Sequence, residues 1–121
     1  MMETNIKPVL LSAGTLNGTT VKNMINEDLG KIEELMINLS TGQVSFAVLS
    51  FGGFLGVGDK LFAIPWEALH FDTENEIVRV DIDKQKLENN TGFDKDHWPK
   101  TGEHLWMVNG APLDYRPNWR R

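Results

Sequence analysis

The chain contains no cysteine, which excludes disulfide bonds, a thiolate nucleophile and any metal site built on cysteine. Basic residues are also scarce, because 12 Lys and Arg stand against 17 Asp and Glu and give a formal net charge of -5. No run of basic residues occurs apart from Arg120 and Arg121. Nucleic acids are bound through basic surfaces, so the composition disfavours nucleic-acid binding and also a peripheral membrane anchor.

Long hydrophobic runs are missing as well. Even the longest apolar runs, such as Phe46–Leu49, are short, whereas a membrane-spanning helix needs about 18 or more apolar residues. The first residues, Met1–Asn5, have no basic stretch followed by an apolar core, which is the pattern of a secretory signal. We therefore expect no membrane insertion and a cytoplasmic location.

The residues that are present favour one globular domain. The chain has 121 residues, of which 40% are hydrophobic and 24% are charged. A domain of this length buries roughly two-thirds of the surface that its unfolded chain exposes. We expect the chain to form a core without a metal ion or another cofactor.

The first third of the chain predicts β-structure. Val9–Leu11 is expected to open a short strand, and the pair Asn17–Gly18 to form a turn. A longer strand is expected over Gly30–Leu39, although its apolar residues do not alternate strictly. One extra residue, at Glu33 or Glu34, would restore the alternation, so we predict a β-bulge there.

A hairpin is predicted next. Ser40–Gly42 forms the turn, in which glycine can adopt the left-handed conformation, and Gln43–Phe51 returns as a strand. Both faces of this return strand are apolar, so both must be covered. One face carries Val44, Phe46 and Val48, and the other carries Ala47, Leu49 and Phe51.

Two more strands are expected, over Lys60–Ile64 and over Glu76–Ile82. Pro65 ends the first of them, and Trp66–Leu69 is expected to form one short helical turn. Short strands about ten residues apart, joined by glycine-containing turns, indicate a mainly β protein with a small closed barrel.

Beyond Ile82 the composition changes. We expect a barrel domain over residues 1–82 and an appendage over residues 83–121 that the barrel does not need for folding. The appendage begins with a predicted helix over Asp83–Asn90, with Asp83 as its N-cap. Its later part combines polar residues with aromatic ones: Trp98, Trp106, Tyr115 and Trp119.

No catalytic, cofactor or metal site is predicted. The glycine-rich segment Gly52–Gly58 is followed by Asp59 and a strand, whereas a phosphate-binding loop needs lysine after its last glycine and then a helix. We interpret the segment as a sharp connection across a barrel end. The three histidines, His70, His97 and His104, lack the spacing of metal ligands. The chain is therefore expected not to be an enzyme.

Four motifs together carry a family resemblance. They are Gly30–Ile32, the Thr41–Gly42 turn, the segment Ser50–Gly58 and the segment Pro65–Leu69. Over roughly residues 10–82 these motifs resemble the PRC-barrel family, while Asn38 departs from the acidic residue often found at its position.

The resemblance implies a small PRC-type β-barrel with short helical turns and a C-terminal extension. This barrel is shared by the cytoplasmic domain of the photosynthetic reaction-centre H subunit, by the C-terminal part of a bacterial ribosome-maturation protein and by stand-alone bacterial and archaeal proteins. Those relatives act through protein contacts. Their contact residues do not match the motif positions here, so the resemblance implies no site residue, and a shared fold does not fix function.

Two functional hypotheses follow. The first is a non-enzymatic interaction or assembly module that forms a homodimer through an exposed apolar strand surface or through the tail and also binds an unidentified protein partner. Exposed apolar patches and aromatic residues are typical of interfaces. The aromatic tail can pack on its own barrel or on another copy. The expected contact residues are Phe51, Phe54, Leu55, Trp106 and Trp119.

The second hypothesis is a domain that senses a small ligand or an ion. Its site would be the barrel mouth around Phe54, Trp66 and His70. A deep pocket with converging polar groups would favour this hypothesis, and an apolar patch paired across a two-fold axis would favour the first.

Overall fold

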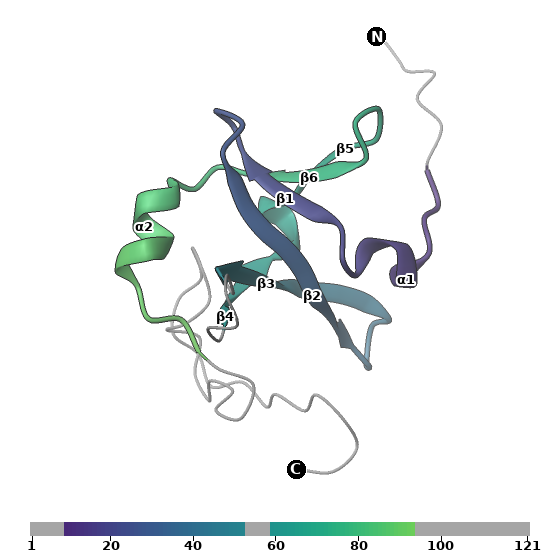
Figure 1. Cartoon of the computed structure of the whole chain (residues 1–121). Helices are drawn as coiled ribbons and strands as arrows, with labels where there is room; N and C mark the ends of the chain where they lie inside the picture. Colours follow the sequence, from purple (N-terminus) through teal and green to yellow (C-terminus); the bar gives the residue numbers. More distant parts are fainter. Residues whose placement is uncertain (1–8, 53–58, 94–121) are drawn as a thin grey trace, which may run out of the picture.

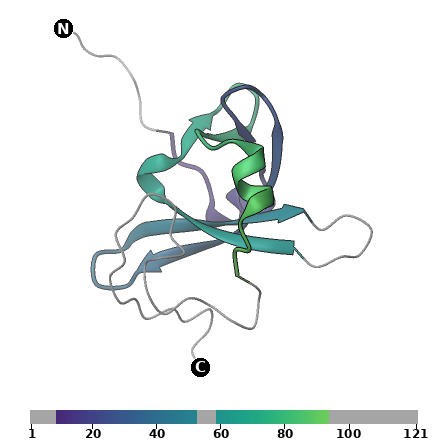
Figure 2. The same cartoon turned by 90° about the vertical axis from the view of Figure 1, so that its left-hand side faces the viewer.

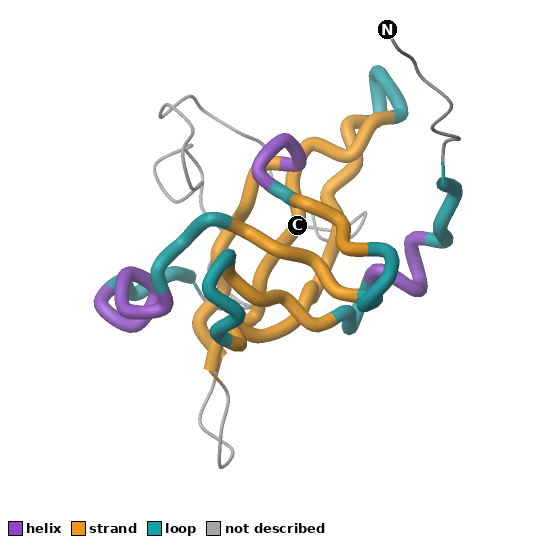
Figure 3. Tube along the Cα trace, turned by 90° about the horizontal axis from the view of Figure 1, so that it is seen from above, coloured by secondary structure: helices purple, strands orange, loops and turns teal. Residues whose placement is uncertain are grey.

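The structure, a computed structural model, describes residues 9–52 and 59–93. Six strands form one mixed sheet, in the order β4-β3-β2-β1-β6-β5, which curls around a core (Figures 1 and 3). The mainly β fold that the sequence predicts is confirmed, but among the described residues the strand ladders do not close the barrel. The elements are α1 (Ala13–Leu16), β1 (Thr20–Asn23), β2 (Asp28–Asn38), β3 (Gln43–Gly52), β4 (Asp59–Pro65), the 3-10 helix η2 (Trp66–Ala68), β5 (His70–Asp72), β6 (Ile77–Val80) and α2 (Lys84–Asn89).

The predicted hairpin and its bulge are both confirmed. Strands β2 and β3 pair antiparallel, and Gly42 in their turn has a φ of 76°. Ile32 lies opposite Leu49 and Glu34 lies opposite Val48, which leaves Glu33 as the extra residue. The bulge places Ile32 and Leu35 on the same side as the core despite their odd spacing.

The first predicted strand is wrong. Val9–Leu11 is exposed and has no strand structure, and the chain forms the short helix α1 directly after it. Ser12 caps this helix, because its Oγ accepts a hydrogen bond of 3.1 Å from the backbone N–H of Thr15. The apolar residues Val9–Leu11 therefore precede a helix whose first turn is capped by the side chain of Ser12.

Strand β5 was not predicted. It has three residues and pairs antiparallel with β6, which in turn pairs parallel with β1. Within the described residues no ladder joins β4 to β5, and the helix η2 connects them in the chain. The short helix predicted after Pro65 is thus confirmed, and it turns the chain from one edge strand to the other.

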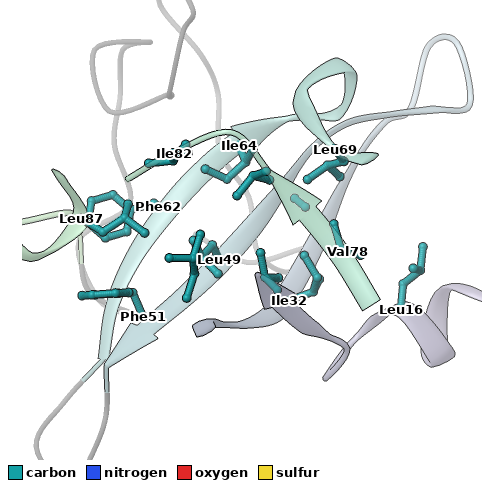
Figure 4. Close-up of a cluster of buried hydrophobic side chains, with 14 residues drawn as sticks. Leu16, Ile32, Leu49, Phe51, Phe62, Ile64, Leu69, Val78, Ile82 and Leu87 are labelled. Carbon is teal, nitrogen blue, oxygen red and sulfur yellow. The ribbon is translucent and has the colours of Figure 1, made fainter. Parts of the chain in front are cut away.

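A first hydrophobic cluster fills the barrel (Figure 4). The inward residues of β3, which include Leu49 and Phe51, meet Phe62 and Ile64 of β4 and Val78 of β6. The cluster also contains Leu16 from α1 and Leu87 from α2, so both short helices close the core. Its buried members are Leu16, Val21, Leu29, Ile32, Ala47, Leu49, Phe51, Phe62, Ile64, Leu69, Val78, Val80, Ile82 and Leu87.

A second cluster lies on the other face of β3 and β4. Phe46 and Val48 of β3 pack there with Leu61 and Ala63 of β4, and Phe93 is the fifth buried member. The backbone of Phe93 exchanges two hydrogen bonds of 2.9 Å with Leu61. The prediction that both faces of this strand are covered is therefore confirmed, and the chain's own Phe93 supplies part of the cover.

Gly30 allows β2 to cross close to β3. Its φ is 134°, and a Cβ built on it would overlap the carbonyl oxygen of Ser50. No other residue fits this position, because both the backbone conformation and the available space exclude a side chain.

Gly30→Ala should destabilise the protein by roughly 2–4 kcal/mol, because either β2 or β3 must move to admit the methyl group. Urea unfolding measures this change. Gly14→Ala is the matched control, since Gly14 is helical and has no atom near its Cβ position. That control should leave stability unchanged or raise it slightly. Equal stability of the two variants would contradict the packing described here.

The packed part of the chain continues past the boundary expected at Ile82. Helix α2 begins after Asp83, as predicted, and its Leu87 is buried in the first cluster. Lys60 fixes the end of this helix, because its Nζ donates to the carbonyl oxygens of Leu87 at 3.4 Å and Glu88 at 2.7 Å. The aromatic residues beyond Phe93 lie outside the described residues.

A chain that ends at Lys84 should be less stable than one that ends at Asp94. The shorter chain lacks Leu87 and Phe93, and loss of one buried side chain of this size costs roughly 2–5 kcal/mol. The midpoint of urea unfolding for the two chains is the measurement. Equal midpoints would show that residues 83–121 are an appendage that the barrel does not need.

Candidate interaction surface

The residues expected at an interface fall in different places. Phe51 lies in the first cluster, where its ring meets that of Phe62 edge-on at 6.4 Å between centroids. Its buried side chain is not part of the surface of the folded chain. Phe54, Leu55, Trp106 and Trp119 lie outside the described residues.

The barrel mouth proposed for a ligand includes two described residues. Trp66 packs partly buried against the first cluster, and its ring lies 5.0 Å from that of Phe71. His70 is exposed on β5, opposite Arg79 in the ladder. Phe54 lies outside the described residues. Trp66 therefore packs against the core and against Phe71.

The turn between β1 and β2 is organised by a buried polar side chain. Asn23 is almost fully buried, and its Oδ1 accepts from the backbone N–H groups of Ile25 at 3.2 Å and Glu27 at 2.8 Å. Its Nδ2 donates to Glu27 Oε1 at 2.7 Å and to the carbonyl oxygen of Ile82 at 3.2 Å. One amide thus shapes the turn and ties it to the residues after β6.

Arg79 holds the same turn from the neighbouring strand. Its Nη1 donates to the carbonyl oxygen of Asn23 at 3.2 Å and to Asn26 Oδ1 at 3.1 Å. Its Nε lies 3.4 Å from Asp72 Oδ2 in a partly exposed ion pair. Hydrogen bonds from Asn75, with a smaller contribution from Arg79, lower the pKa of Asp72 from its usual 3.8.

Asp72→Asn should remove a pH-dependent part of the stability. Because the folded-state pKa of Asp72 is lowered, its stabilising effect is fully present above pH 3.8 and is lost as the pH falls through the lower folded value. The difference in unfolding midpoint between the parent and this variant should therefore shrink below pH 3.8. Glu74→Gln, a change at an exposed neighbour, is the control and should retain the parent's profile. A difference that stays constant with pH would contradict this role.

Large apolar side chains gather at three exposed places. Val9, Leu10 and Leu11 precede α1, Met24 and Ile25 form the tip of the β1–β2 turn, and Ile37 and Leu39 lie at the end of the β2–β3 hairpin. Single exposed apolar residues are ordinary on protein surfaces, whereas adjacent ones mark candidate contact sites.

Among the described residues no group of three or more His, Asp or Glu is placed to hold a metal ion. The helices in the described ranges are also too short and too polar to cross a membrane.

The family model described as the PRC-barrel domain matches residues 8–87. The chain belongs to the PRC-barrel family. The matched part of this PRC barrel includes all six strands and most of α2, so it ends within the helix whose Leu87 completes the core. No protein with a curated description matches the chain.

The sequence predicts an apolar strand or tail surface for this PRC barrel, but not at the residues that the structure exposes. It assigned Val9–Leu11 and Leu39 to strands and therefore did not consider them as exposed residues. Met24 and Ile25 received no assignment. The sequence does place these residues beside turns, which is the signal that could have identified them as exposed. Met24 and Ile25 directly precede Asn26, and Leu39 directly precedes the Ser40–Gly42 turn.

Proposed function

We propose that this PRC barrel is a non-enzymatic interaction or assembly module that associates with a second copy of itself and with a protein partner. The observation that supports the proposal most strongly is the set of adjacent, exposed apolar side chains around a core that the chain's own residues fill. Burial of such side chains against another chain stabilises the complex, because it removes apolar surface from water. The location remains the cytoplasmic one expected from the sequence.

The polar side chains that the barrel buries or partly buries support the same proposal. Asn23 uses its amide in four hydrogen bonds within the chain, and Arg79 is shared among Asn23, Asn26 and Asp72. These groups shape a turn. They are satisfied by the fold, whereas groups that converge on an open pocket are typical of a ligand site.

Sedimentation equilibrium tests the self-association. We expect the average mass to rise from that of a 13.7 kDa chain toward twice that mass as the concentration increases through the micromolar range. A constant mass of 13.7 kDa over the same range would overturn the homodimer. Affinity capture from the native host, followed by reconstitution with the purified candidate, tests the protein partner.

A further inference from the structure

The end of the β2–β3 hairpin extends beyond the sheet. The first residue of β3 with a partner in β4 is Phe46, which lies opposite Pro65, and the β1 ladder on β2 ends at Lys31. We define the hairpin arm as residues 37–45, from Ile37 to Ser45. Within the described residues the arm is a two-stranded ribbon with no strand on either edge, and its turn lies clear of the other described elements (Figures 1 and 2).

The turn of the hairpin arm is held by local hydrogen bonds. The N–H of Gly42 donates to the carbonyl oxygen of Asn38 at 2.7 Å, and the N–H of Ser40 donates to Asn38 Oδ1 at 2.9 Å. Thr41 Oγ1 accepts from the N–H of Gln43 at 3.2 Å. The arm therefore has a defined shape before any partner binds, which lowers the entropy cost of association.

Apolar side chains lie on this arm. Ile37 is 51% exposed and Leu39 is 81% exposed, while Val44, opposite Ile37 in the ladder, is half-buried. A hairpin with two unpaired edges is marginally stable in water without packing against something else. The arm thus combines exposed apolar area with backbone groups that another chain can pair with.

The hairpin arm also carries no charged side chain. No charged residue occurs between Glu34 and Asp59, although 24% of the chain is charged. The only other long charge-free stretch that the structure describes runs from Val9 to Val21. It meets β2 at Ile32, before the arm begins, because the N–H of Gly18 donates to the carbonyl oxygen of Ile32 at 2.7 Å. Five of the exposed large apolar residues lie in these two stretches: Val9, Leu10, Leu11, Ile37 and Leu39.

Charge decides which partner fits this surface. Two copies of the chain each carry a formal net charge of -5 and repel one another wherever acidic faces meet. A contact through the uncharged arm keeps the carboxylates of both copies apart and in water. A cationic partner, in contrast, would gain most from the acidic faces of the barrel.

We propose that the hairpin arm is the surface through which this PRC barrel pairs with a second copy of itself. The inference rests on the proposed self-association and identifies its contact. The pairing is two-fold, so Ile37 and Leu39 of each copy enter the same interface and each substitution acts twice.

The test compares two pairs of substitutions with equal charge changes. The arm variant is Ile37→Glu with Leu39→Glu, and the control is Met24→Glu with Ile25→Glu at the β1–β2 turn. Met24 and Ile25 are 52% and 72% exposed, so the two pairs match in exposure. Sedimentation equilibrium measures the dimer dissociation constant, and circular dichroism confirms that each variant is folded.

We expect the arm variant to raise the dissociation constant at least about 100-fold, because four carboxylates then enter an apolar contact, and the control to change it by less than about fivefold. A second arm variant, Ile37→Thr with Leu39→Ser, adds no charge and should still weaken the dimer about tenfold or more. Raising the salt concentration from about 20 to 500 mM should tighten the parent dimer, because it screens the repulsion between the acidic copies.

The outcomes separate the two proposals. If the parent dimerises and the arm variants dimerise equally well, the arm is not the contact, and the proposed self-association stands. Dissociation of the control alone would move the contact to the β1–β2 turn. A parent that is monomeric throughout overturns the self-association and the arm contact together.

Discussion

Strand β3 has two apolar faces, and the rest of the fold follows from the need to cover both. One face is covered by curling the sheet, which brings β6 and η2 over Ala47, Leu49 and Phe51. The other face cannot be covered by the same curl, because it points out of the barrel. The chain covers it in part by returning after α2 and placing Phe93 against Phe46, Val48 and Leu61. Burial of both faces removes from water the most apolar part of the sequence.

Curling the sheet imposes its own local requirements. Gly30 lets β2 approach the carbonyl oxygen of Ser50, and Glu33 forms the bulge that keeps the apolar residues of β2 directed inward. Just before β2, Asn23 and Arg79 hold the turn that leads from β1. These hydrogen bonds satisfy the buried polar groups, so the turn needs no further contact within the barrel to hold its shape. The apolar side chains of Met24 and Ile25 remain exposed at its tip.

The distribution of charge separates two kinds of surface on one small barrel. Carboxylates lie along the β1–β2 turn, the bulge and the β5–β6 turn. The hairpin arm and residues 9–19 carry no charge and expose most of the large apolar side chains that lie outside the β1–β2 turn. A protein of this charge can pair with its own copy at the lowest electrostatic cost through such a neutral surface.

The sequence by itself determined the local elements and the family. Alternation of apolar residues located β2, β3 and the bulge, the turn glycine located the hairpin, and Pro65 located η2, because each depends on neighbours within a few residues. It could not reveal that Val9–Leu11 lacks a strand partner or that three residues after η2 find one in β6, because strand pairing requires a second segment at hydrogen-bonding distance. The tertiary structure alone decided the parallel pairing of β1 with β6, the place of Leu87 and Phe93 in the core, and the exposure of Ile37 and Leu39. Those outcomes depend on where the sheet ends in space, which no local pattern of residues encodes.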